Sequence, residues 1–230
     1  LVLLAGLRRL GHRRSRGRRL PALARRYARY PLFDVPSTFL SMFSLYAANI
    51  FLFDLFGPRE AGFYSLAFRL AALPMALLAG SLSEVFFQKA AQSYRATGAF
   101  WQPLRFNLIV AGGLAAAVMI ATLLLARIAV DIYLGPGWDP VATVLILVAP
   151  MMAGRFLFHA ISAAPLVIGR TAWLLAANAL LALVPTAIYG LAKLRGLEFA
   201  HFLSLMSGAM SVLYAGLIAL IAWQVRRSYR

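Results

Sequence analysis

The stretch that decides the fold reads FNLIVAGGLAAAVMIATLLLA and occupies residues 106–126. It is 21 residues long and contains no charged side chain. An α-helix needs roughly 20 apolar residues to cross the ~30 Å hydrocarbon core of a bilayer. The stretch therefore predicts a membrane-spanning helix.

Five further stretches of the chain are apolar and long enough to form such helices. Three of them are almost free of ionisable residues, whereas the other two enclose several. Together with residues 106–126 they predict six transmembrane helices in an all-α, polytopic integral membrane protein. The first three cover residues 35–53, 171–192 and 199–225, and the other two cover 61–88 and 140–169.

The composition agrees with a protein that lives in lipid. Of the 230 residues, 62% are apolar and 13% are charged, and the mean hydropathy is +0.78. A soluble domain has ~45–50% apolar and about 25% charged residues. Since a chain of this size has too small an interior to bury the excess, lipid is the remaining solvent.

Neither the cysteines and histidines nor the loops indicate an enzyme. The chain has no cysteine, which excludes a disulfide framework, an iron–sulfur cluster and a thiol nucleophile. Its three histidines are scattered and match no metal-binding motif. The loops on the predicted outer side are short and hold no acid–base or phosphate-binding cluster. The sequence therefore predicts a protein that is not an enzyme and has no cofactor. These loops are residues 57–61, 131–140 and 193–198.

Basic residues predict the orientation. Ten arginines lie between Arg8 and Arg29 in a chain with a net charge of +16. If they are cytoplasmic, six crossings put 17 of the 23 basic residues on that side and four on the other. This satisfies the positive-inside rule and predicts that both termini are cytoplasmic. We interpret the arginine run as a topology signal, with a dock for anionic lipid or partner enzymes as the alternative. No motif that reads nucleic acid accompanies it.

The chain divides into four predicted parts. Residues 1–7 are apolar but too short to span a bilayer, and we interpret them as the tail of an upstream transmembrane helix that this chain lacks. The sequence thus reads as a fragment. Residues 8–30 form a basic cytoplasmic linker, 31–225 the six-helix bundle, and 226–230 a basic cytoplasmic tail.

Ionisable residues inside two predicted spans are the candidate functional groups. A charge at the bilayer centre costs about 2.5–3.5 kcal/mol, so such a side chain usually faces the protein interior or a water-filled cavity. Arg155 and His159 are four residues apart and are therefore neighbours on one helix face. Arg69 and Glu84 share a face of a straight helix but stand ~22 Å apart. The alternative for each is a side chain that reaches the membrane surface or packs between helices.

Prolines inside the spans favour a protein that changes conformation, such as a transporter, over a purely structural anchor. Each proline removes one backbone hydrogen bond and bends its helix. Transporters use such breaks in the segments that line their cavities. The prolines in question are Pro74, Pro150, Pro165 and Pro185.

Short motifs, in order and at matching spacing, resemble those of a known family. They are YPLFDVPS at 30–37, FGPREAGFYSLAFRL at 56–70, LP at 73–74, VFFQKAA at 85–91, LGPGW at 134–138 and GR at 169–170. On these motifs the chain resembles the oligosaccharide flippases of bacterial polysaccharide biosynthesis. These are the O-antigen type within the multidrug/oligosaccharidyl-lipid/polysaccharide exporter superfamily. The resemblance covers most of residues 20–170 and is weaker afterwards.

The resemblance implies a fold of two six-helix bundles that works by alternating access, with this chain as the C-terminal half. The implied cargo is an undecaprenyl-diphosphate-linked repeat unit, carried across the inner membrane for polysaccharide and lipopolysaccharide synthesis. A cationic stripe suits a diphosphate. We therefore expect Arg69, Arg155 and His159 to bind substrate, and Glu84 or Asp54 to bind the coupling proton or sodium ion. The implied partners are that glycan, membrane lipids, the missing N-terminal half, a polysaccharide polymerase and glycosyltransferases.

Two other functions stay open. One is a non-transporting membrane component, either a truncated remnant or a scaffold that holds glycosyltransferases through its basic linker. The other is a multidrug antiporter of the same superfamily, which predicts an acidic cavity and is disfavoured by the basic charge balance. Since one bundle supplies half of a cavity, we do not expect transport from this chain alone.

Overall fold

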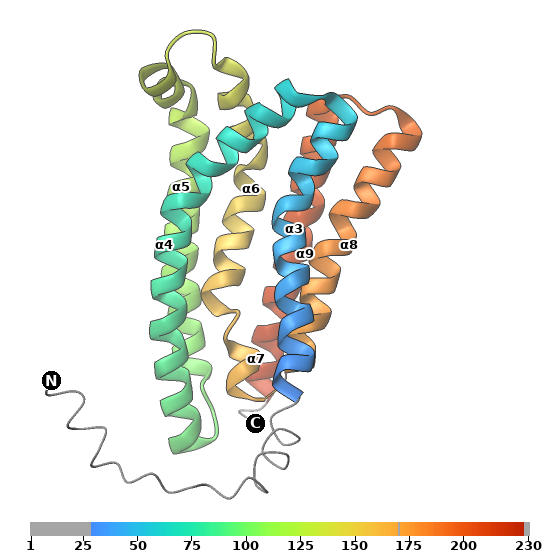
Figure 1. Ribbon diagram of the computed structural model, residues 1–230. Coiled ribbons are helices and arrows are strands. Elements are labelled where there is room, and N and C mark those ends of the chain that lie inside the picture. The colour runs from blue at the N-terminus through green and yellow to red at the C-terminus, as the bar shows by residue number, and fades with distance from the viewer. Residues whose placement is uncertain (1–28, 170, 228–230) are drawn as a thin grey trace, which may run out of the picture.

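The computed structural model describes residues 29–169 and 171–227, and all regular structure in these ranges is helical. This confirms the predicted all-α class. Residues 1–7, nearly all of the predicted linker and the last three residues lie outside the described ranges. Figure 1 shows the helices α3 (Arg29–Phe56), α4 (Pro58–Thr97), α5 (Trp101–Leu134), α6 (Asp139–Ile161), α7 (Ala164–Val167), α8 (Thr171–Arg195) and α9 (Phe199–Arg227).

The predicted membrane fold is confirmed by the length and composition of the helices. Five of them are long and apolar enough to cross a bilayer, and α6 and α7 together form one of the five. The sixth is α4, if its two parts, Pro58–Ala72 and Leu77–Thr97, count as one span. These parts meet at 45°, and Pro74 lies in the bend between them.

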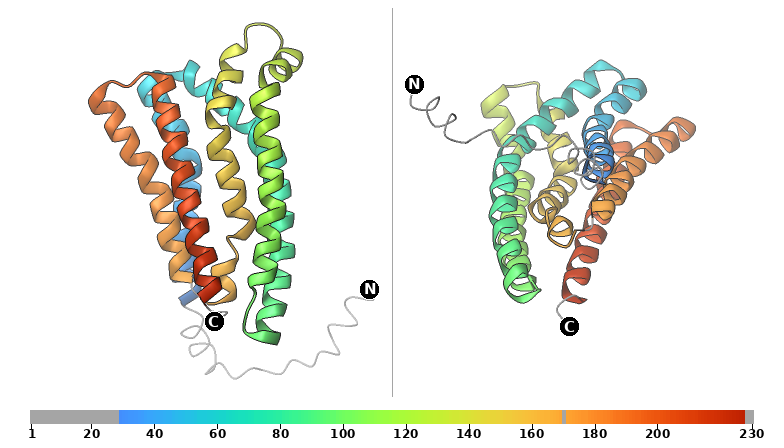
Figure 2. Two further views of the ribbon diagram at one scale, coloured as in Figure 1. Left: turned by 180° about the vertical axis from the view of Figure 1, so that it is seen from behind. Right: turned by 60° about the horizontal axis from the view of Figure 1, so that its bottom comes forward.

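Helix α6 is the centre of the bundle. Twelve of its 23 residues are buried, against six of the 34 residues of α5. It packs against α4, α5 and α9, while α3 packs mainly against α8. In Figures 1 and 2 the α3–α8 pair stands beside the α4–α5–α6 group, and α9 lies against α6 and α8. Side chains of α6 therefore reach the space between the two groups.

The two longest helices, α4 and α5, extend far beyond the thickness of a membrane core. At 1.5 Å per residue, α4 measures roughly 60 Å and α5 roughly 50 Å, against about 30 Å for the hydrocarbon core. Their hairpin extends past the lower ends of α3 and α9 in Figure 1. Gly98 closes α4 in a left-handed conformation, with φ of 71°, and its N–H donates to the carbonyl of Tyr94. The lower end of the bundle is thus the end at which α4 turns into α5.

A buried amide fixes the place where α6 stops. Because α6 ends at Ile161, the last carbonyls of the helix lack partners within it. Asn107 of α5 donates from Nδ2 to the carbonyl of Ala160 over 2.7 Å, and this bond is buried. The contact holds the end of α6, and with it His159, against α5.

Polar contacts join α3 to α8 inside an otherwise apolar interface. Pro185 has no N–H, so the carbonyl of Leu181 loses its partner within α8. The hydroxyl of Ser44 on α3 donates to this carbonyl over 2.7 Å. Further down, Asn178 donates from Nδ2 to the hydroxyl of Ser37 over 2.8 Å. The carbonyl that Pro185 leaves without a partner in α8 is therefore satisfied by α3.

Replacing Ser44 by alanine is expected to lower the free energy of unfolding by about 0.5–1.5 kcal/mol, because the Leu181 carbonyl is left without a donor. The measurement is denaturant-induced unfolding of the purified protein in detergent. Ser41 is the matched control, because it lies one turn away on α3 and makes no hydrogen bond within the described ranges. Equal losses for the two variants would contradict this role for Ser44.

Candidate functional site

Arg155 lies where three cavities of the bundle meet. The largest, of about 530 Å³, lies between α4 and α6 and also touches Leu45 of α3. We name it the α4/α6 cavity. The second, of about 190 Å³, lies between α3, α6 and α8, and we name it the α3/α8 cavity. A third, much smaller one lies above them next to Tyr64 and Tyr214. Arg155 lines all three.

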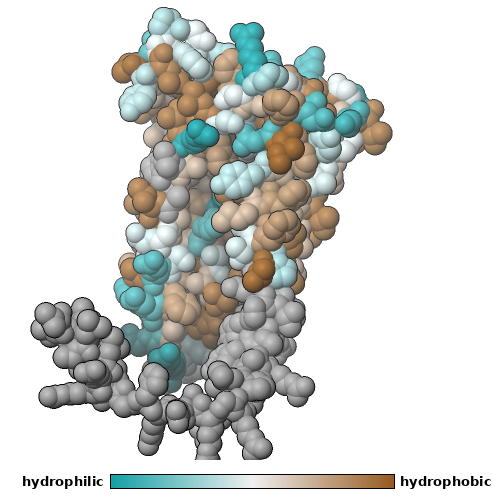
Figure 3. Space-filling model, viewed as in Figure 1, coloured by the Kyte–Doolittle hydropathy of each residue, from teal (hydrophilic) through white to brown (hydrophobic). Residues whose placement is uncertain are grey.

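The α4/α6 cavity changes character along its length. Its upper lining is mainly apolar and includes Phe68, Met75 and Met152. Its lower lining holds Ser83 and Glu84 of α4, facing His159 and Ser162 at the end of α6. Figure 3 shows hydrophilic residues recessed between apolar surfaces on this face of the molecule. The cavity is thus suited to a molecule with one polar and one apolar part.

The guanidinium of Arg155 has no anionic partner within the described ranges. The two ion pairs there join other residues, and no hydrogen bond of Arg155 is found. Its Cζ lies 5.8 Å from the ring centre of Phe68, a cation–π contact. Such a contact is worth about 0.5–2 kcal/mol, less than the about 2.5–3.5 kcal/mol that a charge costs at this depth. The half-buried cation therefore needs water or an anion in the cavity.

His159 and Glu84 lie with Arg155 around the same space. His159 follows Arg155 by one turn, lines both named cavities and is exposed to them. Glu84 lines the lower part of the α4/α6 cavity from the opposite helix. The cavity thus carries two side chains able to bind an anion and one acid able to bind a proton or cation.

Arg69 is not brought to this site. Its side chain is exposed, and it lines none of the three cavities that meet at Arg155. The expected common face of Arg69 and Glu84 assumed a straight helix, and α4 bends by 45° between them. The structure therefore places Glu84 with Arg155 and leaves Arg69 apart.

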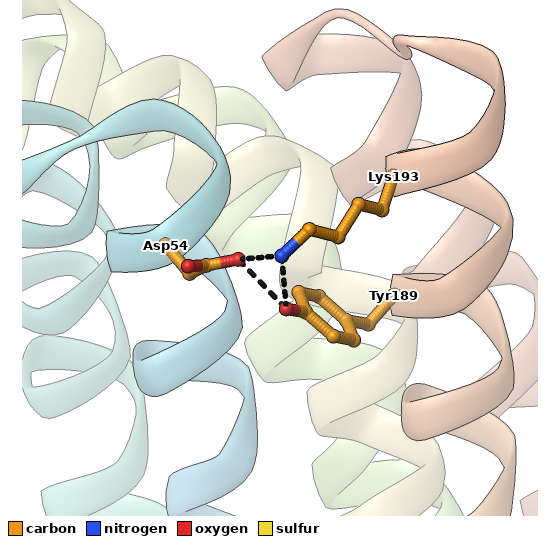
Figure 4. A network of polar contacts seen from close by, with 3 residues as sticks. All are labelled: Asp54, Tyr189 and Lys193. Carbon is orange, nitrogen blue, oxygen red and sulfur yellow. Dashed lines mark hydrogen bonds and ion pairs between the residues drawn. The ribbon is translucent and has the colours of Figure 1, made fainter.

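Asp54 lies at the upper end of α3, in a network shown in Figure 4. Its Oδ2 accepts a hydrogen bond from the hydroxyl of Tyr189 over 2.7 Å and lies 3.0 Å from Nζ of Lys193. That ammonium also donates to the Tyr189 hydroxyl over 3.2 Å. The ring of Phe51 stacks on Tyr189 with centres 4.4 Å apart. In this conformation Asp54 joins α3 to α8 outside the cavities.

Exchanging the charges of Asp54 and Lys193 distinguishes two roles of Asp54, namely pairing with Lys193 and binding of the coupling ion. If Asp54 acts through its pairing with Lys193, the double variant Asp54→Lys, Lys193→Asp is expected to regain most of whatever export activity Asp54→Lys loses, should the protein be the transporter that the resemblance implies. The reason is that the exchange restores an opposite-charge pair at the same place. The measurement is export by the full-length protein in cells. A double variant as inactive as the single one would indicate that the carboxylate itself is required at residue 54.

The sequence reasoning missed the polar lining of the α3/α8 cavity. Hydroxyl side chains of α3 face Asn178 of α8 and Tyr214 of α9 across it. Counted from Ser37, the other hydroxyl residues follow after one, four and seven positions, which places them on one face of an otherwise apolar helix. This pattern is a signal that could have revealed them. The hydroxyls belong to Ser37, Thr38, Ser41 and Ser44.

No metal centre is evident in the part of the chain that the structure describes. There, no three side chains of histidine, aspartate or glutamate lie close enough together to hold a metal ion.

Comparison with known proteins identifies a family. A family model described as "Polysaccharide biosynthesis protein" matches residues 22–143, which is more than half of the chain. The match covers α3, α4, α5 and the first turn of α6, and thus includes Glu84 but ends before Arg155 and His159. Searches of curated proteins and of solved structures gave no match.

Proposed function

Because the chain belongs to the polysaccharide biosynthesis protein family, we propose that it moves a lipid-linked oligosaccharide across a membrane by alternating access. The proposed cargo is an undecaprenyl-diphosphate-linked repeat unit, and the membrane is the bacterial inner membrane. The product would be a surface polysaccharide such as O-antigen. We propose further that both termini and the lower end of the bundle are cytoplasmic.

Arg155 is the observation that supports this proposal most strongly. A diphosphate presents several oxygens that accept hydrogen bonds, and guanidinium can donate to two of them in parallel. Arg155 offers its donors at the junction of the cavities, and no anionic side chain in residues 29–169 and 171–227 pairs with it. His159, one turn below, adds a further group able to donate to the same diphosphate.

The two halves of the α4/α6 cavity suit the two ends of an amphiphilic cargo. The polar lower lining would receive the diphosphate and sugars, and the apolar upper lining would contact the beginning of the polyprenyl chain. The rest of the lipid would stay in the bilayer against the exposed apolar side chains of the helices. In this proposal the protein changes no covalent bond, so it acts as a transporter and not as an enzyme.

The experiment that tests the proposal is depletion of the full-length protein in its host, followed by analysis of lipid-linked glycans. Loss of a flippase is expected to remove surface polysaccharide while completed lipid-linked repeat units accumulate on the cytoplasmic side. Loss of a scaffold for glycosyltransferases would instead leave these units unmade. Normal polysaccharide together with drug sensitivity would favour an antiporter. Either of the last two results would contradict the proposal.

A further inference from the structure

The lower half of α4 bears a polar surface that continues the α4/α6 cavity beyond the bundle. Glu84 lines that cavity, and the side chains three, four, seven and 11 residues later follow on nearly the same helix face. A shallow groove on α4 is lined by these later residues. We name this surface the α4 track and define it as Glu84, Phe87, Gln88, Ala91 and Arg95.

The other faces of the same segment are different. One neighbouring face is exposed and carries Leu78 and Val85. Another is buried against α5, where Phe86 lies 6.4 Å from Phe100 between ring centres. The α4 track is thus one exposed face of this segment, beside the face of Leu78 and Val85 and opposite the side buried with Phe86. Figure 3 shows hydrophilic residues continuing down α4 on the side of the recess.

The groups of the α4 track suit a neutral, hydroxyl-rich ligand. Gln88 can both donate and accept hydrogen bonds, Glu84 accepts them and Arg95 donates them. None of these three has a hydrogen bond or ion pair to another described residue, so their capacity is unused. The exposed ring of Phe87 offers an apolar surface next to Gln88. A sugar ring is complementary to these groups, because the hydroxyls around its edge can form hydrogen bonds and the C–H groups on its faces can pack on an aromatic ring.

From this arrangement of unpartnered polar groups beside an exposed aromatic ring, we infer that the α4 track binds the glycan of the cargo while Arg155 binds its diphosphate. This inference rests on the proposed function and adds a separate sugar site to it. Glu84 and Arg95 stand roughly 16 Å apart along the helix, which suits several sugar units in a row. The cargo would lie with its diphosphate at Arg155 and its sugars along α4 toward the lower end.

Two lipid probes test the sugar site on the full-length protein in nanodiscs. One is undecaprenyl diphosphate without sugar, and the other is the lipid-linked repeat unit extracted from the host's membranes. The double variant Phe87→Ala, Gln88→Leu is expected to bind the sugar-bearing lipid at least about tenfold more weakly and to bind undecaprenyl diphosphate unchanged. Gln102→Leu is the matched control, because Gln102 is also exposed near the lower end but lies on α5, outside the track.

The outcomes distinguish the sugar site from the proposed function. Unchanged binding of the sugar-bearing lipid, or equal weakening of both lipids, would overturn the sugar site while leaving transport possible. A wild-type protein that binds neither lipid would overturn the proposed function and the sugar site together. Melting temperatures of all variants show whether a loss of binding comes from unfolding. A second variant, Gln88→Glu, keeps the size and acceptor capacity and is expected to retain more sugar binding than Gln88→Leu.

Discussion

Replacing Arg155 by alanine in the full-length protein is expected to abolish export of surface polysaccharide while membrane insertion stays normal. The change removes the donor group that lines all three cavities. Truncating one side of a desolvated charge contact costs about 2–5 kcal/mol, so affinity for undecaprenyl diphosphate should fall at least about 30-fold. The measurements are surface polysaccharide in a complemented strain and binding in nanodiscs.

Three further arginine variants make this result specific. Arg155→Lys keeps the charge but loses the planar fork, so we expect partial export. Arg69→Ala is expected to reduce export less than Arg155→Ala does, because Arg69 lines none of the three cavities at Arg155. Arg127→Ala is the control, since Arg127 is exposed at the upper part of α5. Full export by Arg155→Ala would remove the physical basis of the proposed function.

A leucine at Gly154 is expected to prevent correct folding. A Cβ atom at this position would lie 3.1 Å from Cβ and 3.3 Å from Cδ2 of Tyr214 on α9. Tyr214 is buried, and α6 and α9 pack closely here, so the larger side chain would force the helices apart. Overpacking of this kind costs about 1–3 kcal/mol or more. The measurement is the fraction of protein that elutes as a single species in detergent, together with its melting temperature.

Gly113→Leu is the matched control for Gly154→Leu. Gly113 lies inside α5, is exposed, and has no atom within 4 Å of an added Cβ. We expect this variant to fold normally, because leucine has a higher helix propensity than glycine and the new side chain meets open space. If both variants fold equally well, the close approach of α6 to α9 at Tyr214 is not needed for folding.

Most of the fold could be predicted because length and hydrophobicity decide it. The uncharged stretch 106–126 lies well inside α5, which runs eight residues further to Leu134. Arg127 thus does not mark the end of a helix. The predicted span 140–169 is divided in the structure between α6 and α7, with Pro165 near the start of α7. Charge gaps therefore locate membrane crossings better than helix ends.

The candidate site was predictable only where the helix stays regular. Arg155 and His159 line a common cavity because α6 is regular between them. The same reasoning put Arg69 and Glu84 on one face of a straight helix, whereas α4 bends by 45° between them and Arg69 lines none of the three cavities at Arg155. The pairing of Asp54 with Lys193 joins residues 139 positions apart, and no local pattern announces such a contact. Long-range pairing thus sets the limit of what one sequence predicts.

The most direct test of the account asks whether the cavity at Arg155 contains water. The chain has no cysteine, so a single introduced thiol is the only one in these residues. Ser83 lines the α4/α6 cavity, whereas Ser81 lies two residues earlier on the exposed face with Leu78 and Val85. Because maleimides react with the thiolate, labelling by a membrane-impermeant maleimide requires water at the thiol. We predict fast labelling of Ser83→Cys from the cytoplasmic side and little labelling of Ser81→Cys in intact membranes. Labelling of Ser83→Cys that is no faster than that of Ser81→Cys would contradict a water-filled cavity for an anionic cargo.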